Sequence, residues 1–207
     1  MEKAGTGNYG LTVKVLKDYD LLKTVKASLA GKKVVLDMSG HTIRWTDGFV
    51  SSESIPTMFS VVTGSLTITG NGTIKNDSTS LARAIVVYYP VESEDAAQRA
   101  VVTIKNGTFD VNTSEVVYVG RGSAIIEGGS FKGIENNQYN DHRYTINCLD
   151  GEYTAGRSKV TISGGSFYEF DPKDGLSEGA HTDFTANGYV SEYDEESGYY
   201  TVIKSND

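Results

Sequence analysis

Two polar segments late in the chain carry the side chains that could do chemistry. Asp141 and Arg143 stand in "NDHRY", and Asp150 and Glu152 follow in "LDGEY". Paired carboxylates can act as the acid and the nucleophile or base of glycoside hydrolysis. These four residues are therefore the candidate catalytic set. A solvated turn at the end of a strand explains the same residues, and we favour that interpretation.

The chain is also rich in aromatic residues, with 13 tyrosines. Tyr88, Tyr89 and Tyr118 fall in equivalent strand-like runs, so they could form an exposed stripe that holds sugars or a partner protein. The alternative, which we favour, places alternate members inside the core and leaves the others as ordinary surface aromatics. The three tyrosines are the candidate binding residues.

The sequence indicates neither a metal site nor a cofactor. His41, His142 and His181 lie far apart, without the spacing of a zinc site. The segment "DPKDG" (171–175) is ordinary turn chemistry and lacks the further acidic positions of a calcium loop. Cys148, in "YTINCL", reads as a small buried hydrophobe. We therefore predict no metal and no cofactor.

Charge and hydropathy restrict the partners. The net charge is −8, from 27 acidic and 19 basic residues, and no basic patch is visible, so we predict no nucleic-acid partner. No run approaches the roughly 20 apolar residues of a membrane span, so no membrane insertion is predicted. The opening "MEKAGTGNYG" has no apolar core of a secretion signal, which favours a protein made in a cytoplasm.

Two patterns organise the rest of the chain. Leu21, Leu22, Val25 and Leu29 repeat at helical spacing, so a helix is predicted over 20–31, with Gly31 as C-cap. After it, runs of β-branched and aromatic residues end at Gly, Asn, Asp or Ser, which is typical of short strands. One phrase recurs in these strands: "VTIKNGTF", "AIIEGGSF" and "VTISGGSF".

The recurring phrase predicts stacked parallel strands. Its isoleucines, with one earlier counterpart, stand 36, 22 and 36 residues apart, at Ile68, Ile104, Ile126 and Ile162. Such a repeat, with insertions of variable length at one phase, indicates a solenoid, here a parallel β-helix of about four to five coils. Ile104, Ile126 and Ile162 would form one interior ladder. Phe109, Phe131 and Phe167 would form a second, continued by Ile74, and Gly164 and Gly165 would make a corner too tight for a Cβ.

We expect a single domain over 1–207. Residues 1–19 would be an arm or attachment segment, 20–31 a helix that caps the open end, and 33–170 the coils. Residues 171–207 would form the C-terminal cap, because "YVSEYDEESGYYTVI" (189–203) alternates apolar and polar residues around a turn and predicts a β-hairpin.

The repeated phrases behind a predicted helix resemble the right-handed parallel β-helix, or pectate-lyase-like, superfamily. The segment from Arg143 to Lys204, with "VTISGGSF", "EFDPKDG" and "TANGY" before a Tyr-rich hairpin, resembles the C-terminal module of β-helix proteins of tailed bacteriophages and gut bacteria. The resemblance implies a single-stranded right-handed β-helix, a place on the virion surface, other capsid or tail proteins as partners, and a homotrimer.

On these grounds we expect a non-enzymatic structural or adhesive protein of a tailed-phage virion, namely a head decoration, a head fibre or a spike module, that binds host-surface glycans. Two alternatives stay open. One is a carbohydrate-active lyase or hydrolase whose site lies in an insertion groove near 133–158. The other is an adhesin domain of a gut bacterium.

Overall fold

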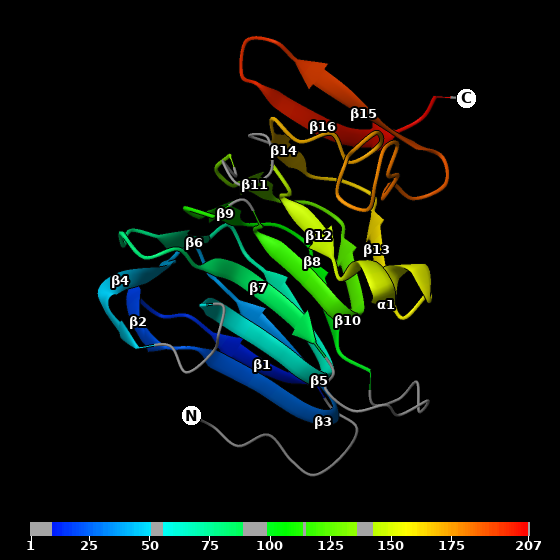
Figure 1. Cartoon of the computed structure of the whole chain (residues 1–207). Coiled ribbons are helices and arrows are strands. Elements are labelled where there is room, and N and C mark those ends of the chain that lie inside the picture. The colour runs from blue at the N-terminus through cyan, green and yellow to red at the C-terminus, as the bar shows by residue number, and fades with distance from the viewer. Residues whose placement is uncertain (1–9, 51–55, 89–98, 114, 136–142, 207) are drawn as a thin grey trace.

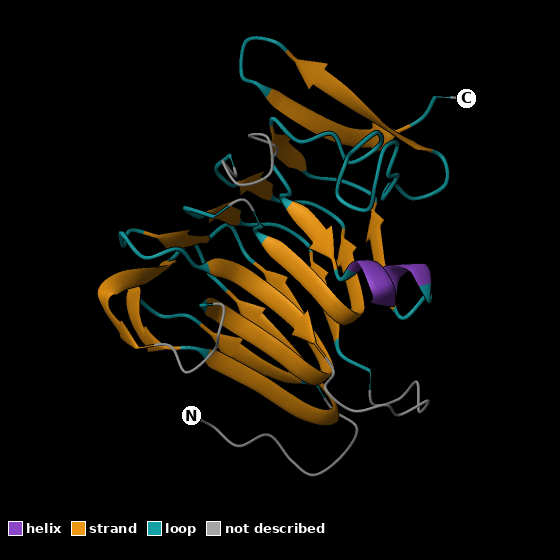
Figure 2. Cartoon of the chain, in the orientation of Figure 1, coloured by secondary structure: helices purple, strands orange, loops and turns teal. Residues whose placement is uncertain are grey.

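The computed structural model describes residues 10–50, 56–88, 99–113, 115–135 and 143–206 (Figure 1). Nearly all of its regular structure is β-strand, and the described residues contain one short helix, α1 (Asp150–Thr154) (Figure 2). The strands form two sheets of eight strands each. The candidate residues Tyr89 and Asp141 lie outside the described residues.

The first sheet is parallel, and part of it closes on itself. Strands β5 and β10 each pair with β7 through their first half and with β8 through their second half. The pairings β5–β7–β10–β8 thus form a closed cycle, a small parallel barrel. The strands of this sheet are β1 (Leu11–Lys14), β3 (Val25–Asp37), β5 (Thr57–Thr69), β7 (Arg83–Tyr88), β8 (Val101–Ile104), β10 (Val117–Ile126), β12 (Ile146–Cys148) and β13 (Ser158–Ile162).

The second sheet is mixed. It is parallel from β2 to β14 and antiparallel where β14 meets β16 and β16 meets β15. The hairpin predicted near the C-terminus forms as β15 and β16. In spatial order the strands are β2 (Tyr19–Lys23), β4 (Thr42–Val50), β6 (Thr73–Asn76), β9 (Thr108–Asp110), β11 (Ser130–Lys132), β14 (Ser166–Tyr168), β16 (Tyr199–Lys204) and β15 (Tyr189–Asp194).

The predicted β-helix of four to five coils behind a capping helix is wrong. The strands form a small closed barrel and a mixed sheet instead of uniform coils. The sequence pattern predicted short strands throughout, but β5 is one continuous strand of 13 residues. Gly64 allows this, because its positive φ of 71° bends the strand without ending it.

The predicted helix over 20–31 is also wrong. The segment forms β2 and most of β3, which pair with β4 and β5. Leu21 is 4% exposed and its neighbour Leu22 is 62% exposed, which is the alternation of a strand. An isolated helix of this length has little stability of its own. Pairing with the neighbouring strands therefore outweighs the local preference for a helix.

Both predicted ladders are confirmed. Ile68 lies beside Ile104, Ile104 beside Ile126, and Ile126 beside Ile162 in the strand register. Phe131 stacks between Phe109 and Phe167, with ring centroids 4.9 Å apart on each side. Ile74 continues that column beside Phe109.

The ladders belong to one hydrophobic core, which runs from Leu21 to Val202 and takes side chains from both sheets. Within the described residues no helix is long and apolar enough to cross a bilayer.

Candidate functional site

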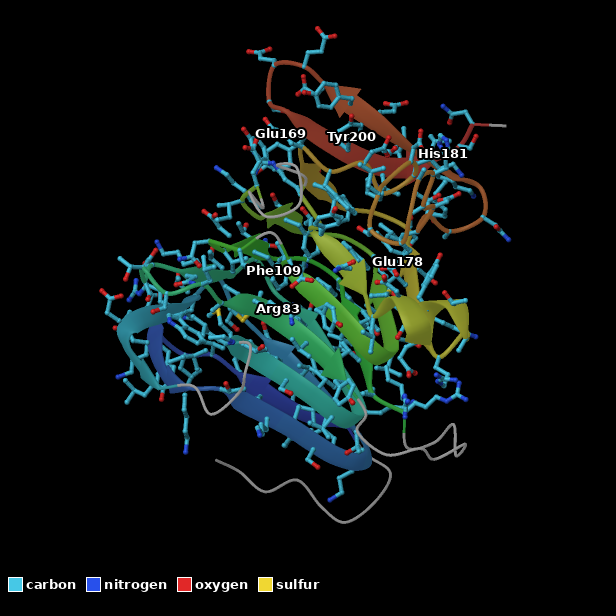
Figure 3. The ribbon with its side chains drawn as sticks, in the orientation of Figure 1. Arg83, Phe109, Glu169, Glu178, His181 and Tyr200 are labelled. Atoms are coloured by element: carbon cyan, nitrogen blue, oxygen red, sulfur yellow. The ribbon has the colours of Figure 1, made fainter. Side chains whose placement is uncertain are left out.

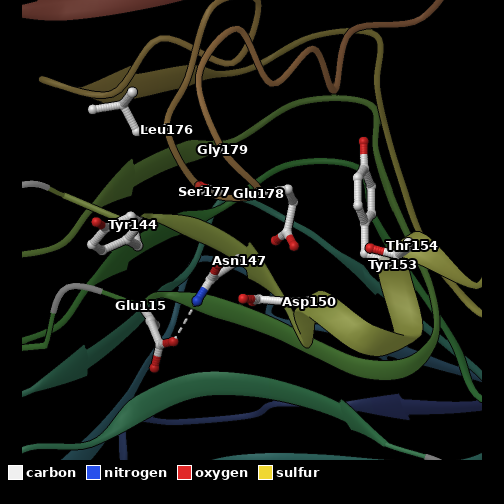
Figure 4. Close-up of a pocket in the computed structure, with 10 residues that line it drawn as sticks. All are labelled: Glu115, Tyr144, Asn147, Asp150, Tyr153, Thr154, Leu176, Ser177, Glu178 and Gly179. Atoms are coloured by element: carbon white, nitrogen blue, oxygen red, sulfur yellow. Dashed lines mark hydrogen bonds between the residues drawn. The ribbon is translucent and has the colours of Figure 1, made fainter.

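A pocket of about 630 Å³ opens where β12, α1 and the loop after β14 meet (Figure 4). We call it the acidic pocket, because three carboxylates line it. Its size is in the range of small-molecule sites. The lining residues are Glu115, Tyr144, Asn147, Asp150, Tyr153, Thr154, Leu176, Ser177, Glu178 and Gly179.

Hydrogen bonds to the edge of β12 hold the loop that carries Glu178. The Cys148 N–H donates to Glu178 Oε1 at 2.6 Å, and the Ser177 hydroxyl donates to the Ile146 carbonyl at 2.7 Å. Within the loop, the Glu178 N–H donates to Thr182 Oγ1 at 3.0 Å. Side chains of the loop thus bind main-chain groups of β12, and this fixes one wall of the pocket to the sheet.

Asn147, from β12, is oriented by Glu115 on the neighbouring strand end. Its Nδ2 donates to Glu115 Oε1 at 2.7 Å, and the other oxygen of Glu115 receives Arg83. A carboxylate only accepts hydrogen bonds, so the amide must turn its nitrogen to Glu115 and its oxygen away. Asn147 Oδ1 is then buried without a partner among the described residues.

Glu178 presents a second such atom. Its Oε2 is buried without a partner among the described residues, and Figure 4 shows the carboxyl group and Asn147 directed into the same space. Burial raises the pKa of Glu178, and the charge of Asp150 raises it further. A buried polar atom without a partner costs roughly 1–3 kcal/mol, so a ligand that donates to these two oxygens gains accordingly.

Aromatic and charged groups complete the pocket. Tyr153 is held edge-on against Phe184, with the ring centroids 6.1 Å apart, and burial raises its pKa. Tyr144 lines the side nearer to Asn147 (Figure 4). Because Arg83 compensates Glu115, the charge that faces the cavity comes from Asp150 and Glu178.

The three candidate catalytic residues that the structure describes, Arg143, Asp150 and Glu152, are not brought together. Asp150, the first residue of α1, lines the acidic pocket. Glu152 is buried between Arg121 and Arg157. Arg143 pairs with Glu169 and lies 5.0 Å from the centroid of the Tyr168 ring. Figure 3 shows Glu169 and Glu178 on different loops.

Of the tyrosines predicted to form a stripe, the two that the structure describes, Tyr88 and Tyr118, make different contacts. Tyr88 is 43% exposed, and its ring packs against Gly120, where a Cβ would collide with it. The ring of Tyr118 lies under the guanidinium of Arg83 at 4.2 Å. Tyr118 thus packs against the same guanidinium that binds Glu115.

Sequence reasoning missed Glu115, Asn147 and Glu178. They are separated by about 30 residues each and have no shared motif. Only the parallel pairing of β10 with β12, in the register Val117 beside Ile146, and the loop bonded to β12 bring them together. In the described part of the chain no group of three His, Cys, Asp or Glu side chains could hold a metal ion.

The chain matches no protein-family model, no curated protein and no solved structure. Together with the barrel and the mixed sheet, this corrects the resemblance to the pectate-lyase-like superfamily and to the phage and gut-bacterial module. The geometry of the acidic pocket is therefore the basis for a functional proposal.

Proposed function

We propose that this protein is a non-enzymatic adhesive protein that binds glycans in the acidic pocket. One observation carries the proposal: two residues that line the same pocket, Asn147 and Glu178, each have a buried oxygen (Oδ1 and Oε2) without a partner among the described residues. Adjacent hydroxyl groups of a sugar are donors that could satisfy both. Tyr144 and Tyr153 offer aromatic surface for the apolar face of the ring.

The charge of the pocket restricts the ligand class. Asp150 and Glu178 contribute negative charge, while the cation Arg83 is already bound to Glu115. An acidic sugar would meet like charges in a partly buried site, which disfavours it. The proposed ligands are therefore neutral or amine-bearing sugars.

Binding can be measured by calorimetry with three oligosaccharide classes, namely neutral, amino-substituted and uronate. We expect binding of the first two and not of the third. Asn147→Ala removes one orphaned acceptor and should weaken binding about tenfold, the equivalent of one net hydrogen bond. Asn187→Ala, the same change at an exposed position outside the lining, is the control. Binding that Asn147→Ala leaves unchanged, or no binding of any class, contradicts the proposal.

A hydrolase is the second candidate, because Glu178 has the properties of a general acid. Burial and the neighbouring carboxylate of Asp150 raise its pKa, and a carboxyl group with a raised pKa can serve as the acid in glycoside hydrolysis. Under this alternative the wild-type chain releases sugar and Glu178→Gln loses turnover while it keeps binding. Under our proposal neither chain releases product.

The predicted place on a virion and the virion partners stay predictions from the sequence. The predicted homotrimer also stays a prediction, and as a closed assembly it is the alternative to the open association proposed below. Genes for capsid, portal and tail proteins beside this one are the observation expected if they hold. Neighbouring genes for sugar uptake would favour the hydrolase instead.

A further inference from the structure

The mixed sheet ends in two strand edges at opposite ends of the molecule. β2 pairs with β4 on one side, β15 pairs with β16 on one side, and neither has a second neighbour among the described residues (Figure 1). A free strand edge is a row of backbone donors and acceptors that another strand can satisfy. The parallel sheet differs at its C-terminal end, because the loop with Ser177 and Glu178 bonds to β12.

One column of side chains crosses the whole mixed sheet and ends in a tyrosine on each side. In strand register it runs Tyr19, Ile43, Ile74, Phe109, Phe131, Phe167, Tyr200, Tyr193. The six inner members stack within the sheet, whereas Tyr19 is 51% and Tyr193 50% exposed. Figure 3 shows Tyr200 on the terminal hairpin, far from the end that holds β2. The column therefore stops at two half-covered rings of the same type.

Exposed apolar side chains concentrate at the β2 end. Half of the twelve exposed large hydrophobic residues in the described part of the chain lie between residues 11 and 25: Leu11, Val13, Leu16, Tyr19, Leu22 and Val25. Single exposed hydrophobic residues are normal, but a concentration of this kind marks an interaction surface.

Charge distinguishes the two ends. Exposed lysines surround the β2 end, at Lys14, Lys17 and Lys23. The two exposed carboxylates at this end, Asp18 and Asp20, both pair with Arg44, so the lysines set the sign of its net charge. Exposed carboxylates occupy the other end, on β15 and the turn after it, at Glu192, Asp194, Glu195 and Glu196. The two ends are therefore complementary to each other, and each would repel a copy of itself.

Strand direction allows the two edges to pair. β14 runs parallel to β2 through the intervening strands, β16 runs opposite to β14, and β15 opposite to β16. β15 thus has the same direction as β2. In a second copy stacked without rotation of its strands, β15 of one molecule would pair with β2 of the next in the parallel manner of the sheet.

We propose that copies of this chain associate head to tail, with β15 of one copy added to β2 of the next and Tyr193 placed beside Tyr19. The contact continues the mixed sheet and its side-chain column from one molecule into another. Because the two surfaces differ, the interface is heterologous and does not close as a symmetric dimer does. Each molecule in the row presents its acidic pocket again, so weak binding of a repetitive glycan gains avidity.

Cysteine cross-linking tests the geometry. In the double variant Tyr19→Cys with Tyr193→Cys, mild oxidation should give a ladder of covalent multimers on a non-reducing gel. Each single variant should stay monomeric, and a mixture of the two single variants should stop at the dimer. Cys148 is buried and is present in every variant, so any cross-linking through it is the same in all samples.

Charge reversal tests the attraction. In light scattering, the mean mass of the wild-type chain should rise with protein concentration and fall with salt, which screens exposed charges. Lys14→Glu, Lys17→Glu and Lys23→Glu together should raise the concentration needed for association more than tenfold. So should Glu192→Lys, Glu195→Lys and Glu196→Lys together. Mixing the two triple variants should restore association.

Three results would overturn the proposal. They are a double cysteine variant that stays monomeric, a single variant that cross-links as well as the double one, and a closed trimer whose mass does not change with concentration. Circular dichroism of every variant, compared with the wild-type spectrum, ensures that a loss of association is not a loss of folding.

Discussion

At the scale of single residues, Glu152 shows how a charge is used to hold elements together. It is 9% exposed and accepts bidentate hydrogen bonds from Arg121 of β10 at 2.8 Å and from Arg157 at 2.5 and 2.9 Å. These bonds hold the pKa of its carboxyl well below the usual range. The residue that the sequence singled out as a candidate acid is thus a permanent anion that ties α1 to the parallel sheet.

The first prediction concerns this anion. A carboxylate with a lowered pKa in the folded state stabilises the fold above its unfolded pKa of about 4.3, and this stabilisation is lost as the pH falls. Glu152→Gln should therefore lower the melting temperature by several degrees at pH 7, with a difference that shrinks below pH about 4. Glu127→Gln is the control, because Glu127 is exposed and 3.6 Å from Lys105. A difference that does not change with pH would contradict this role.

At the scale of elements, the close approach of neighbouring turns depends on glycine. A Cβ at Gly164 would overlap the carbonyl oxygen of Glu127 in the adjacent turn, so the close approach predicted from "VTISGGSF" is confirmed. Next to it, Gly165 has a positive φ of 103°. Because the two turns approach so closely, the Ser166 N–H donates to the Gly129 carbonyl at 2.8 Å. This hydrogen bond fixes the register of the phenylalanine column.

A matched pair of substitutions tests whether the close approach of the turns requires glycine. Gly164→Ala forces backbone atoms apart and should destabilise the fold by about 1–3 kcal/mol. Gly151→Ala adds the same methyl group inside α1, where nothing lies within 4 Å, and should be neutral or stabilising by up to about 1 kcal/mol. Urea denaturation of both variants measures the difference, and equal effects would refute the argument from close approach.

At the scale of the whole molecule, a single core connects the barrel, the mixed sheet and the terminal hairpin. Buried side chains from Leu21 on β2 to Val202 on β16 belong to one hydrophobic cluster. The ladders run across strands that are distant in sequence, so no part of the column can be lost without exposing its neighbours. This continuity favours cooperative unfolding.

The corresponding prediction is a single thermal transition. In scanning calorimetry at a concentration and salt that keep the chain monomeric, the calorimetric and van't Hoff enthalpies should agree. Phe131→Ala, which removes the ring between Phe109 and Phe167, should lower the whole transition, at a cost of about 3–5 kcal/mol. Two resolved transitions, only one of them shifted by the substitution, would show two independent cores.

Of the residues that line the acidic pocket, the sequence pointed to only one. Asp150 stands beside a strand in a polar segment, a local signal that made it a candidate, and the structure places it in the lining of the acidic pocket. Glu115 and Glu178 carry no such signal, because each is an ordinary acidic residue next to a strand or in a loop. Their chemistry arises from what lies opposite them, namely Arg83 and Asn147 for Glu115 and the Cys148 N–H for Glu178.

The sequence by itself determined which residues stack. The spacing of Ile104, Ile126 and Ile162 and of the three phenylalanines predicted both ladders, because the period of two and the repeated glycine turn are local properties of the backbone. Only the tertiary structure decided that residues 20–31 are strands, that β5 and β10 close a barrel and that a pocket forms beside β12. Those outcomes depend on pairing between distant segments, whose free energy exceeds local preference and leaves no trace in residue spacing.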